Sequence, residues 1–200
     1  MPQFDLRGIY AAKYVNTAGT ISYTNVEKVG DAMTAQLELR FAEGRLYAES
    51  ALAEYLRKAV GGTISLGVKY IKSAAQKLMF GSSDSARTIT YTPAGSSSTA
   101  TASVSGLKIG AKTTGQYVGV AFYAPDMVDG VEKYTCVKIA KALFGPPSMQ
   151  LQTAGENIQF NTPTTSGEFM ADDSTAQDLL EVAIADTEEQ AIAWVQAVLA

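Results

Sequence analysis

The segment of residues 34–41, with the sequence TAQLELRF, decides the fold class of this chain. Its polar and apolar residues alternate without a break over eight positions, which is typical of a strand with one buried face and one wet face. The apolar side carries Ala35, Leu37, Leu39 and Phe41, and the polar side carries Thr34, Gln36, Glu38 and Arg40. This stretch predicts a sheet that packs on a core through one face and meets solvent or a partner through the other.

Strand patterns recur on both sides of this segment. A hairpin is predicted where residues 16–19, with Asn first and Gly last, join two runs rich in β-forming residues. A second reversal is predicted within residues 125–130, which end in Asp-Gly, and a turn is predicted at residues 162–166. The remaining strands are predicted at residues 8–15, 20–24, 63–69, 117–123, 132–140, 157–161 and 167–171.

A helix is predicted after residues 46–48, because apolar residues recur there at the helical spacing i, i+3, i+4 and i+7. The glycine pair Gly61-Gly62 is expected to end it. The residues that carry this spacing are Leu52, Tyr55, Leu56 and Ala59.

Two further helices are indicated by capping boxes, in which a hydroxyl residue precedes a glutamine by three positions. Ser73 with Gln76 predicts a short helix that ends near Gly81, and Thr187 with Gln190 predicts the last helix of the chain. The expected fold is therefore mainly β, of the α+β class, with two or three short helices.

A Ser/Thr/Gly-rich segment occupies about residues 82–115. Its middle has the composition of a flexible linker, while residues 87–92 and 104–109 on either side are able to pair as an extended hairpin. The segment is too short to separate two domains. We therefore expect a long projecting loop or arm within a single domain of residues 1–200.

Composition argues against an enzyme. The chain has no histidine and one cysteine, which excludes histidine-dependent catalysis, a disulfide within the chain and cysteine-pair metal sites. No motif for a cofactor or metal is found, so none is expected. The longest apolar run, residues 118–124, is far shorter than a membrane span, and the first ten residues do not suggest a secretory signal.

Charge is distributed unevenly along the chain, whose net charge is −4. Residues 1–141 carry 16 basic and 11 acidic side chains, whereas residues 142–200 carry nine acidic and no basic ones. Such asymmetry is typical of an interaction surface and allows unlike ends of two copies to attract one another. A strongly basic nucleic-acid binder is disfavoured by the net charge.

Six segments, in this order, give the chain a family resemblance. It resembles the major tail (tail tube) proteins of long-tailed phages of Gram-positive bacteria, over most of residues 5–199. The segments are LYAESALAE (46–54), GTISLGV (62–68), YVGVAF (117–122), GVEKY (130–134), IQFNTPT (158–164) with Gly167, and EEQAIAWV (188–195).

The resemblance implies a tail-tube-type β-sandwich or barrel with a flanking helix. Such subunits form hexameric rings that stack head to tail into a hollow tube, through which DNA passes without specific binding. The implied partners are further copies of the chain, a tape measure protein, and tail-terminator and tip proteins. The implied location is the virion tail, and the host cytoplasm before assembly.

Two alternatives remain open at this point. The chain is equally compatible with the tube protein of a tail-like particle, such as a gene-transfer agent or tailocin. A protein of another class, a free-standing β-sandwich that binds carbohydrate or acts as an adhesin, predicts a monomer and an aromatic binding platform.

Candidate assembly residues follow from the strand pattern together with the resemblance. The polar side of residues 34–41 is expected to line the lumen or a subunit contact, with an ordinary solvent-facing surface as the alternative. Its residues are Thr34, Gln36, Glu38 and Arg40. Contacts between rings are expected at Asn16, Thr17, Ala18, Gly19, Ser96, Ser97, Ser98 and Thr99.

Overall fold

A computed structural model describes residues 5–48, 51–128, 130–148 and 162–200, and it confirms a mainly β fold of the α+β class. Every strand pairing among these residues is antiparallel. The elements are β1 (Arg7–Thr17), β2 (Thr20–Lys28), β3 (Ala32–Ala48), β4 (Ala51–Val68), α1 (Ser73–Phe80), β5 (Ser83–Tyr91), β6 (Ala100–Lys108), β7 (Tyr117–Val128), β8 (Val131–Phe144), β9 (Thr164–Met170), β10 (Leu180–Ala185) and α2 (Glu188–Ala197).

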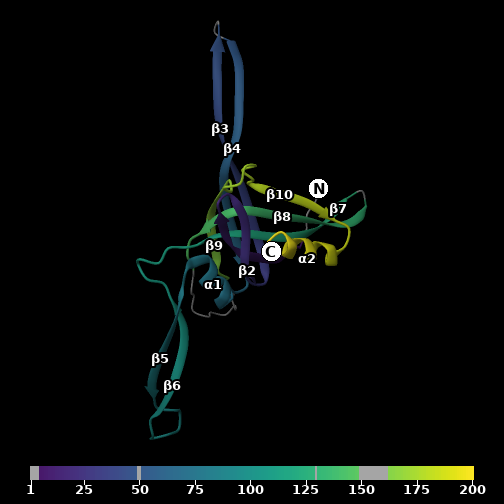
Figure 1. The fold of residues 1–200 in the computed structure, drawn as a ribbon. Helices are drawn as coiled ribbons and strands as arrows, with labels where there is room; N and C mark the ends of the chain where they lie inside the picture. The colour runs from purple at the N-terminus through teal and green to yellow at the C-terminus, as the bar shows by residue number, and fades with distance from the viewer. Residues whose placement is uncertain (1–4, 49–50, 129, 149–161) are drawn as a thin grey trace, which may run out of the picture.

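One eight-stranded sheet forms the body, with the strand order β2-β1-β7-β8-β9-β4-β3 and with β10 paired to β8 (Figure 1). The long hairpin β7–β8 is its centre. One edge of β8 pairs with β7, while its other edge pairs with β10 over residues 134–139 and with β9 over residues 141–144. Two groups of strands therefore diverge from β8, which lets them pack on one another.

Two buried clusters lie on opposite faces of β1, β7 and β8 because successive side chains of a strand point to opposite faces. The first lies between these strands and β3, β4 and β9, and it includes α1. The second lies beneath α2. The body is thus sandwich-like with a covering helix. Representative members are Ile64, Val120, Ile139 and Phe169 in the first cluster, and Tyr23, Cys136, Val195 and Leu199 in the second.

Two hairpin arms leave the body in opposite directions (Figure 1). Strands β3 and β4 pair from Ala32 with Val68 to Ala48 with Ala51, but β9 accompanies β4 only over residues 62–67. Beyond that point the hairpin has two strands alone, and we call residues 41–48 with 51–59 the β3–β4 arm. The second arm is the β5–β6 arm, a separate two-stranded sheet.

The helix predicted around residues 52–59 is wrong, because these residues belong to β4. Their apolar spacing also fits a strand, in which the same residues are shared between two faces. Gly61 and Gly62 do not end a helix. They lie in β4 where the arm leaves the body, next to a register shift at which Val60 is left unpaired, and Gly61 has a φ of 145°.

The first hairpin is confirmed, but its turn is shorter than predicted. Strand β1 continues through Asn16 and Thr17, so only Ala18 and Gly19 connect the strands, both with positive φ. Positive φ at both central residues is characteristic of a type I′ turn. The Asn16 Oδ1 atom accepts a hydrogen bond from the Gly19 amide at 2.9 Å and fixes the turn.

The two capping boxes have different outcomes. Helix α2 begins as predicted, since the Thr187 Oγ1 atom accepts a hydrogen bond from the Gln190 amide at 3.3 Å. Helix α1 exists as predicted, but Lys72 rather than Ser73 precedes its first turn and no side chain caps it. Gln76 instead donates a hydrogen bond to the Ile71 carbonyl oxygen at 3.0 Å.

The remaining strand predictions differ mainly at their ends. Strands β7 and β8 extend further toward their connection than predicted, to Val128 and from Val131. The turn predicted at residues 162–166 is wrong from Thr164 onward, where β9 begins. The predicted strand at residues 157–161 lies outside the described residues.

Candidate assembly surfaces

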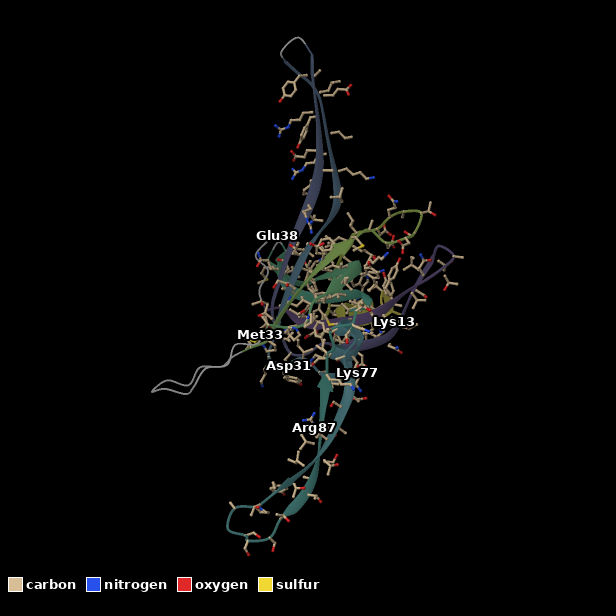
Figure 2. The ribbon with its side chains drawn as sticks, turned by 90° about the vertical axis from the view of Figure 1, so that its left-hand side faces the viewer. Lys13, Asp31, Met33, Glu38, Lys77 and Arg87 are labelled. Atoms are coloured by element: carbon tan, nitrogen blue, oxygen red, sulfur yellow. The ribbon has the colours of Figure 1, made fainter. Side chains whose placement is uncertain are left out.

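The predicted polar side of β3 is confirmed as an exposed row of four side chains. Cross-strand pairing extends this row onto β4 and β9, because residues opposite one another share a face. We call the combined surface the polar face; Glu38 lies in it near the base of the β3–β4 arm (Figure 2). Its residues are Thr34, Gln36, Glu38, Arg40, Thr63, Ser65, Thr164, Ser166 and Glu168.

The polar face carries five hydroxyl side chains and little net charge. Its one cation, Arg40, lies 2.9 Å from a carboxylate oxygen of Glu168 on β9, and the Gln36 amide donates to Glu38 at 3.2 Å. Two carboxylates against one guanidinium leave the face slightly negative. A phosphate backbone is held by unpaired basic side chains, and the one cation of this face is already paired.

The outer edge of β3 borders the polar face. Strands β3 and β2 end the sheet, so no described strand pairs with the outer edge of either. A long strand with a free edge presents unpaired N–H and C=O groups to any neighbouring chain. Because β3 is 17 residues long, its edge is a large surface for pairing with another strand.

On one face of the β3–β4 arm, the charged side chains form ion pairs and cation–π contacts within the arm, and we call it the ionic face. Glu43 lies 3.5 Å from Arg45 and 3.4 Å from Arg57, measured between carboxylate oxygens and guanidinium nitrogens. The Arg57 guanidinium also lies 3.9 Å from the centre of the Phe41 ring, and Arg45 lies 5.6 Å from that of Tyr55. These contacts join the two strands where no core supports them.

The opposite face of the same arm carries unsupported apolar side chains, and we call it the leucine face. Leu46 is 58% exposed and Leu56 is 72% exposed. Glu54 pairs with Leu46 and lies two residues from Leu56 on this face, and Lys58, paired with Ala42, shares the face nearer the body. Apolar groups at such exposure favour burial against another molecule.

The β5–β6 arm is also amphipathic. Ile89, Tyr91 and Val104 share one face and are 40–51% exposed. Alanines lie opposite Ile89 and Tyr91, and Arg87 lies opposite Val104. A two-stranded hairpin is only marginally stable on its own, so an exposed apolar face of this kind favours packing against a partner. The residues of its other face are Thr88, Thr90, Thr101, Ser103 and Ser105.

The structure does not bring the two predicted groups of inter-ring residues together. Residues 96–99 are exposed at the tip of the β5–β6 arm, on which Arg87 is labelled in Figure 2. Residues 16–19 are exposed at the end of the β1–β2 hairpin, beside the body. The predicted pairing of the segments that flank the Ser/Thr-rich middle is confirmed by β5 and β6.

Asp173 anchors the β1–β2 hairpin, a role that sequence reasoning missed. Its carboxylate accepts hydrogen bonds from Lys141 Nζ at 2.8 Å, the Tyr14 hydroxyl at 2.9 Å and Asn16 Nδ2 at 3.2 Å. The hydrogen bond from Lys141, followed by those from Tyr14 and Asn16, lowers the pKa of Asp173 below its ordinary value. No local pattern signals this contact, because Asn16 and Asp173 are far apart in sequence.

The described residues offer little for catalysis or metal binding. In residues 5–48, 51–128, 130–148 and 162–200, no three Cys, Asp or Glu side chains gather in a group that could hold a metal ion. Cys136 is buried, and burial raises the pKa of its thiol to about 11, which keeps it protonated and unreactive at neutral pH. No helix of the described part is long and apolar enough to cross a membrane.

Comparison of the chain with protein-family models and with curated proteins gives no match.

Proposed function

We propose that this chain is a non-enzymatic structural protein whose copies assemble into a hollow tube of stacked hexameric rings, of the kind that forms the tail tube of long-tailed phages. The ordered resemblance of its sequence segments motivates the proposal. The fold supports it through three surfaces that a solitary molecule leaves unused: the two arms, the free edge of β3, and the polar face.

The two arms carry the proposal. They leave opposite ends of the body (Figure 1), and each exposes apolar side chains on one face. A contact between unlike ends of identical molecules does not close on itself, so it propagates as a filament. An open stack of rings is a filament of this type.

The free edge of β3 supplies a route to ring closure. Pairing of this edge with the next copy would continue the sheet around the ring and remove its unpaired N–H and C=O groups. The polar face would then continue from copy to copy. We propose that it lines the lumen, where its paired Arg40 and slight negative charge would let DNA pass without being held.

The proposal also covers the location of the tube and its partner proteins. We propose a virion location in the tail after assembly in the host cytoplasm, and partners that include a tape measure protein and tail-terminator and tip proteins. A tail-like particle, such as a gene-transfer agent or tailocin, would use the same subunit geometry.

A concentration series in sedimentation velocity tests the proposal. The purified 21.2 kDa chain should be converted to large particles as its concentration rises, and negative-stain microscopy of those particles should show rings or tubes with a central channel. A single slow species at every concentration and salt condition would rule the proposal out and favour a free-standing binding module.

A further inference from the structure

We propose that the leucine face of the β3–β4 arm binds a proline-rich groove beside α1 on the next copy in the stack. This inference rests on the proposed function and names one contact that would join successive subunits. It concerns residues other than those predicted from sequence at the β1–β2 turn and the β5–β6 tip.

The groove lies where the β5–β6 arm leaves the body, and we call it the proline groove. It has a volume of about 560 Å³. Its lining is mostly apolar, and Lys69 is the charged residue in it, with no acidic side chain among the described residues that line it. The other principal lining residues are Tyr70, Leu107, Ile109, Pro146, Pro147 and Pro163.

The groove and the arm tip lie at opposite ends of one strand. Strand β4 begins at Ala51 at the end of the arm and finishes at Val68, directly before Lys69 and Tyr70 of the groove. Eighteen residues of strand span on the order of 60 Å. Placing a second copy end to end along this strand therefore brings the arm of one molecule to the groove of the next.

Charge favours the leucine face over the ionic face as the surface that binds the groove. Glu54 neighbours Leu46 and Leu56 near the end of the arm and makes no ion pair within the described part of the chain, whereas Lys58 of the same face lies nearer the body. Lys69 likewise has no acidic partner among the described residues. The ionic face is a poor candidate because the single carboxylate of Glu43 is shared by Arg45 and Arg57, which leaves this face with a net positive charge that would repel Lys69. The outer part of the leucine face, where Glu54 is the charged residue among the described ones, thus matches an apolar groove that holds an ammonium group.

The prolines of the groove favour side-chain packing over the addition of a strand to the sheet. Pro146, Pro147 and Pro163 have no backbone N–H, so they cannot donate hydrogen bonds to an added strand. The leucine face also has room for a close approach, since a side-chain carbon at Gly44 would meet nothing within 4 Å. We therefore infer that side chains of the arm pack into the groove and that the arm does not extend the sheet there.

Disulfide trapping tests the contact directly in the full-length chain. A variant with both Leu56→Cys and Ile109→Cys should give a ladder of covalent multimers on oxidation, because each copy offers one thiol to each neighbour. Either single variant lacks the second thiol of the contact, so it should stay monomeric on denaturing gels and cannot pass beyond a dimer; native Cys136 is fully buried and does not compete. The matched control combines Arg45→Cys, on the ionic face of the same arm, with Ile109→Cys, and it should give no ladder.

Charge reversal gives a second and independent test. Glu54→Lys and Lys69→Glu should each raise the protein concentration needed for assembly by about tenfold, and combining them should restore most of the loss. Each of these residues is exposed in the isolated chain, so the variants should melt like the unmodified protein.

The outcomes separate this inference from the proposed function. Tubes of the unmodified protein, without a ladder for the Leu56–Ile109 pair and without rescue by the double reversal, would overturn the inference and leave the tube intact. Failure of the unmodified protein to assemble at all would overturn both.

Discussion

Replacing Gly62 by alanine should destabilise the body, because β4 passes too close to its neighbours there for any side chain. A Cβ atom at this position would lie within 3.0 Å of the Glu38 carbonyl oxygen on β3 and of ring atoms of Phe169 on β9. Neither neighbour can yield easily, since one is backbone in a paired strand and the Phe169 side chain is only 2% exposed.

The magnitude follows from two opposing effects. Overpacking a rigid core site costs up to about 3 kcal/mol, whereas replacing glycine by alanine restricts the unfolded chain and recovers about 0.4–1 kcal/mol. The net loss in the free energy of unfolding is about 2 kcal/mol. For a chain of 200 residues this corresponds to a melting temperature lower by roughly 4–8 °C.

Thermal unfolding followed by circular dichroism measures the effect, at a protein concentration too low for assembly. Gly44→Ala is the matched control, because Gly44 lies in the same hairpin with nothing within 4 Å of its added carbon. Gly44→Ala should leave the melting temperature unchanged or slightly raised. If Gly62→Ala has the same melting temperature as Gly44→Ala, then β3, β4 and β9 do not pack as closely as the structure shows.

Three further predictions concern the hairpin anchor, α2 and the β5–β6 arm. Because the pKa of Asp173 is lowered, its carboxylate stabilises the fold fully at pH values above the ordinary pKa of 3.8. This stabilisation is lost as the pH falls through the lowered pKa. Asp173→Asn should therefore flatten the acid side of a plot of melting temperature against pH. An unchanged acid limb would show that the anchor contributes nothing to stability. Thr187→Ala should reduce the free energy of unfolding in urea by about 1 kcal/mol through loss of the helix cap, whereas Thr187→Ser should retain most of it. Deleting residues 96–102 should leave a folded subunit that polymerises poorly, and an unaltered distribution of tube lengths in the microscope would reject a role for this tip.

Much of the body was predictable from local patterns. The alternation of residues 34–41 predicted both the strand and its wet face. Its apolar side packs on the core only at Ala35 and Leu37, whereas Leu39 and Phe41 are 39–40% exposed. The cap of α2 was predictable because Thr187 and Gln190 are three residues apart. Short-range signals of this kind need no knowledge of the rest of the fold.

The β3–β4 arm was not predictable from the same signals. In a strand without a core, the two-residue period disappears and the remaining apolar residues can fit a helical spacing by chance. The contacts that hold the arm as a hairpin, such as Glu43 with Arg57 and Arg57 with Phe41, join residues 14 and 16 positions apart. They become visible only when the strands are paired.

The hairpin anchor and the proline groove depend on still longer separations. Asp173 meets Asn16 across 157 positions, and the groove collects Lys69, Ile109 and Pro163 from three separate parts of the chain. Sequence patterns report which face of an element is wet, but they do not report which elements come together to form a surface.

A reconstruction of the assembled particle by cryo-electron microscopy tests the central claim most directly. The account predicts a hollow cylinder in which the free edge of β3 is paired with an adjacent copy and Glu38 and Arg40 face the channel. A particle whose channel is lined by other strands, with these two side chains on its outer wall, would contradict it.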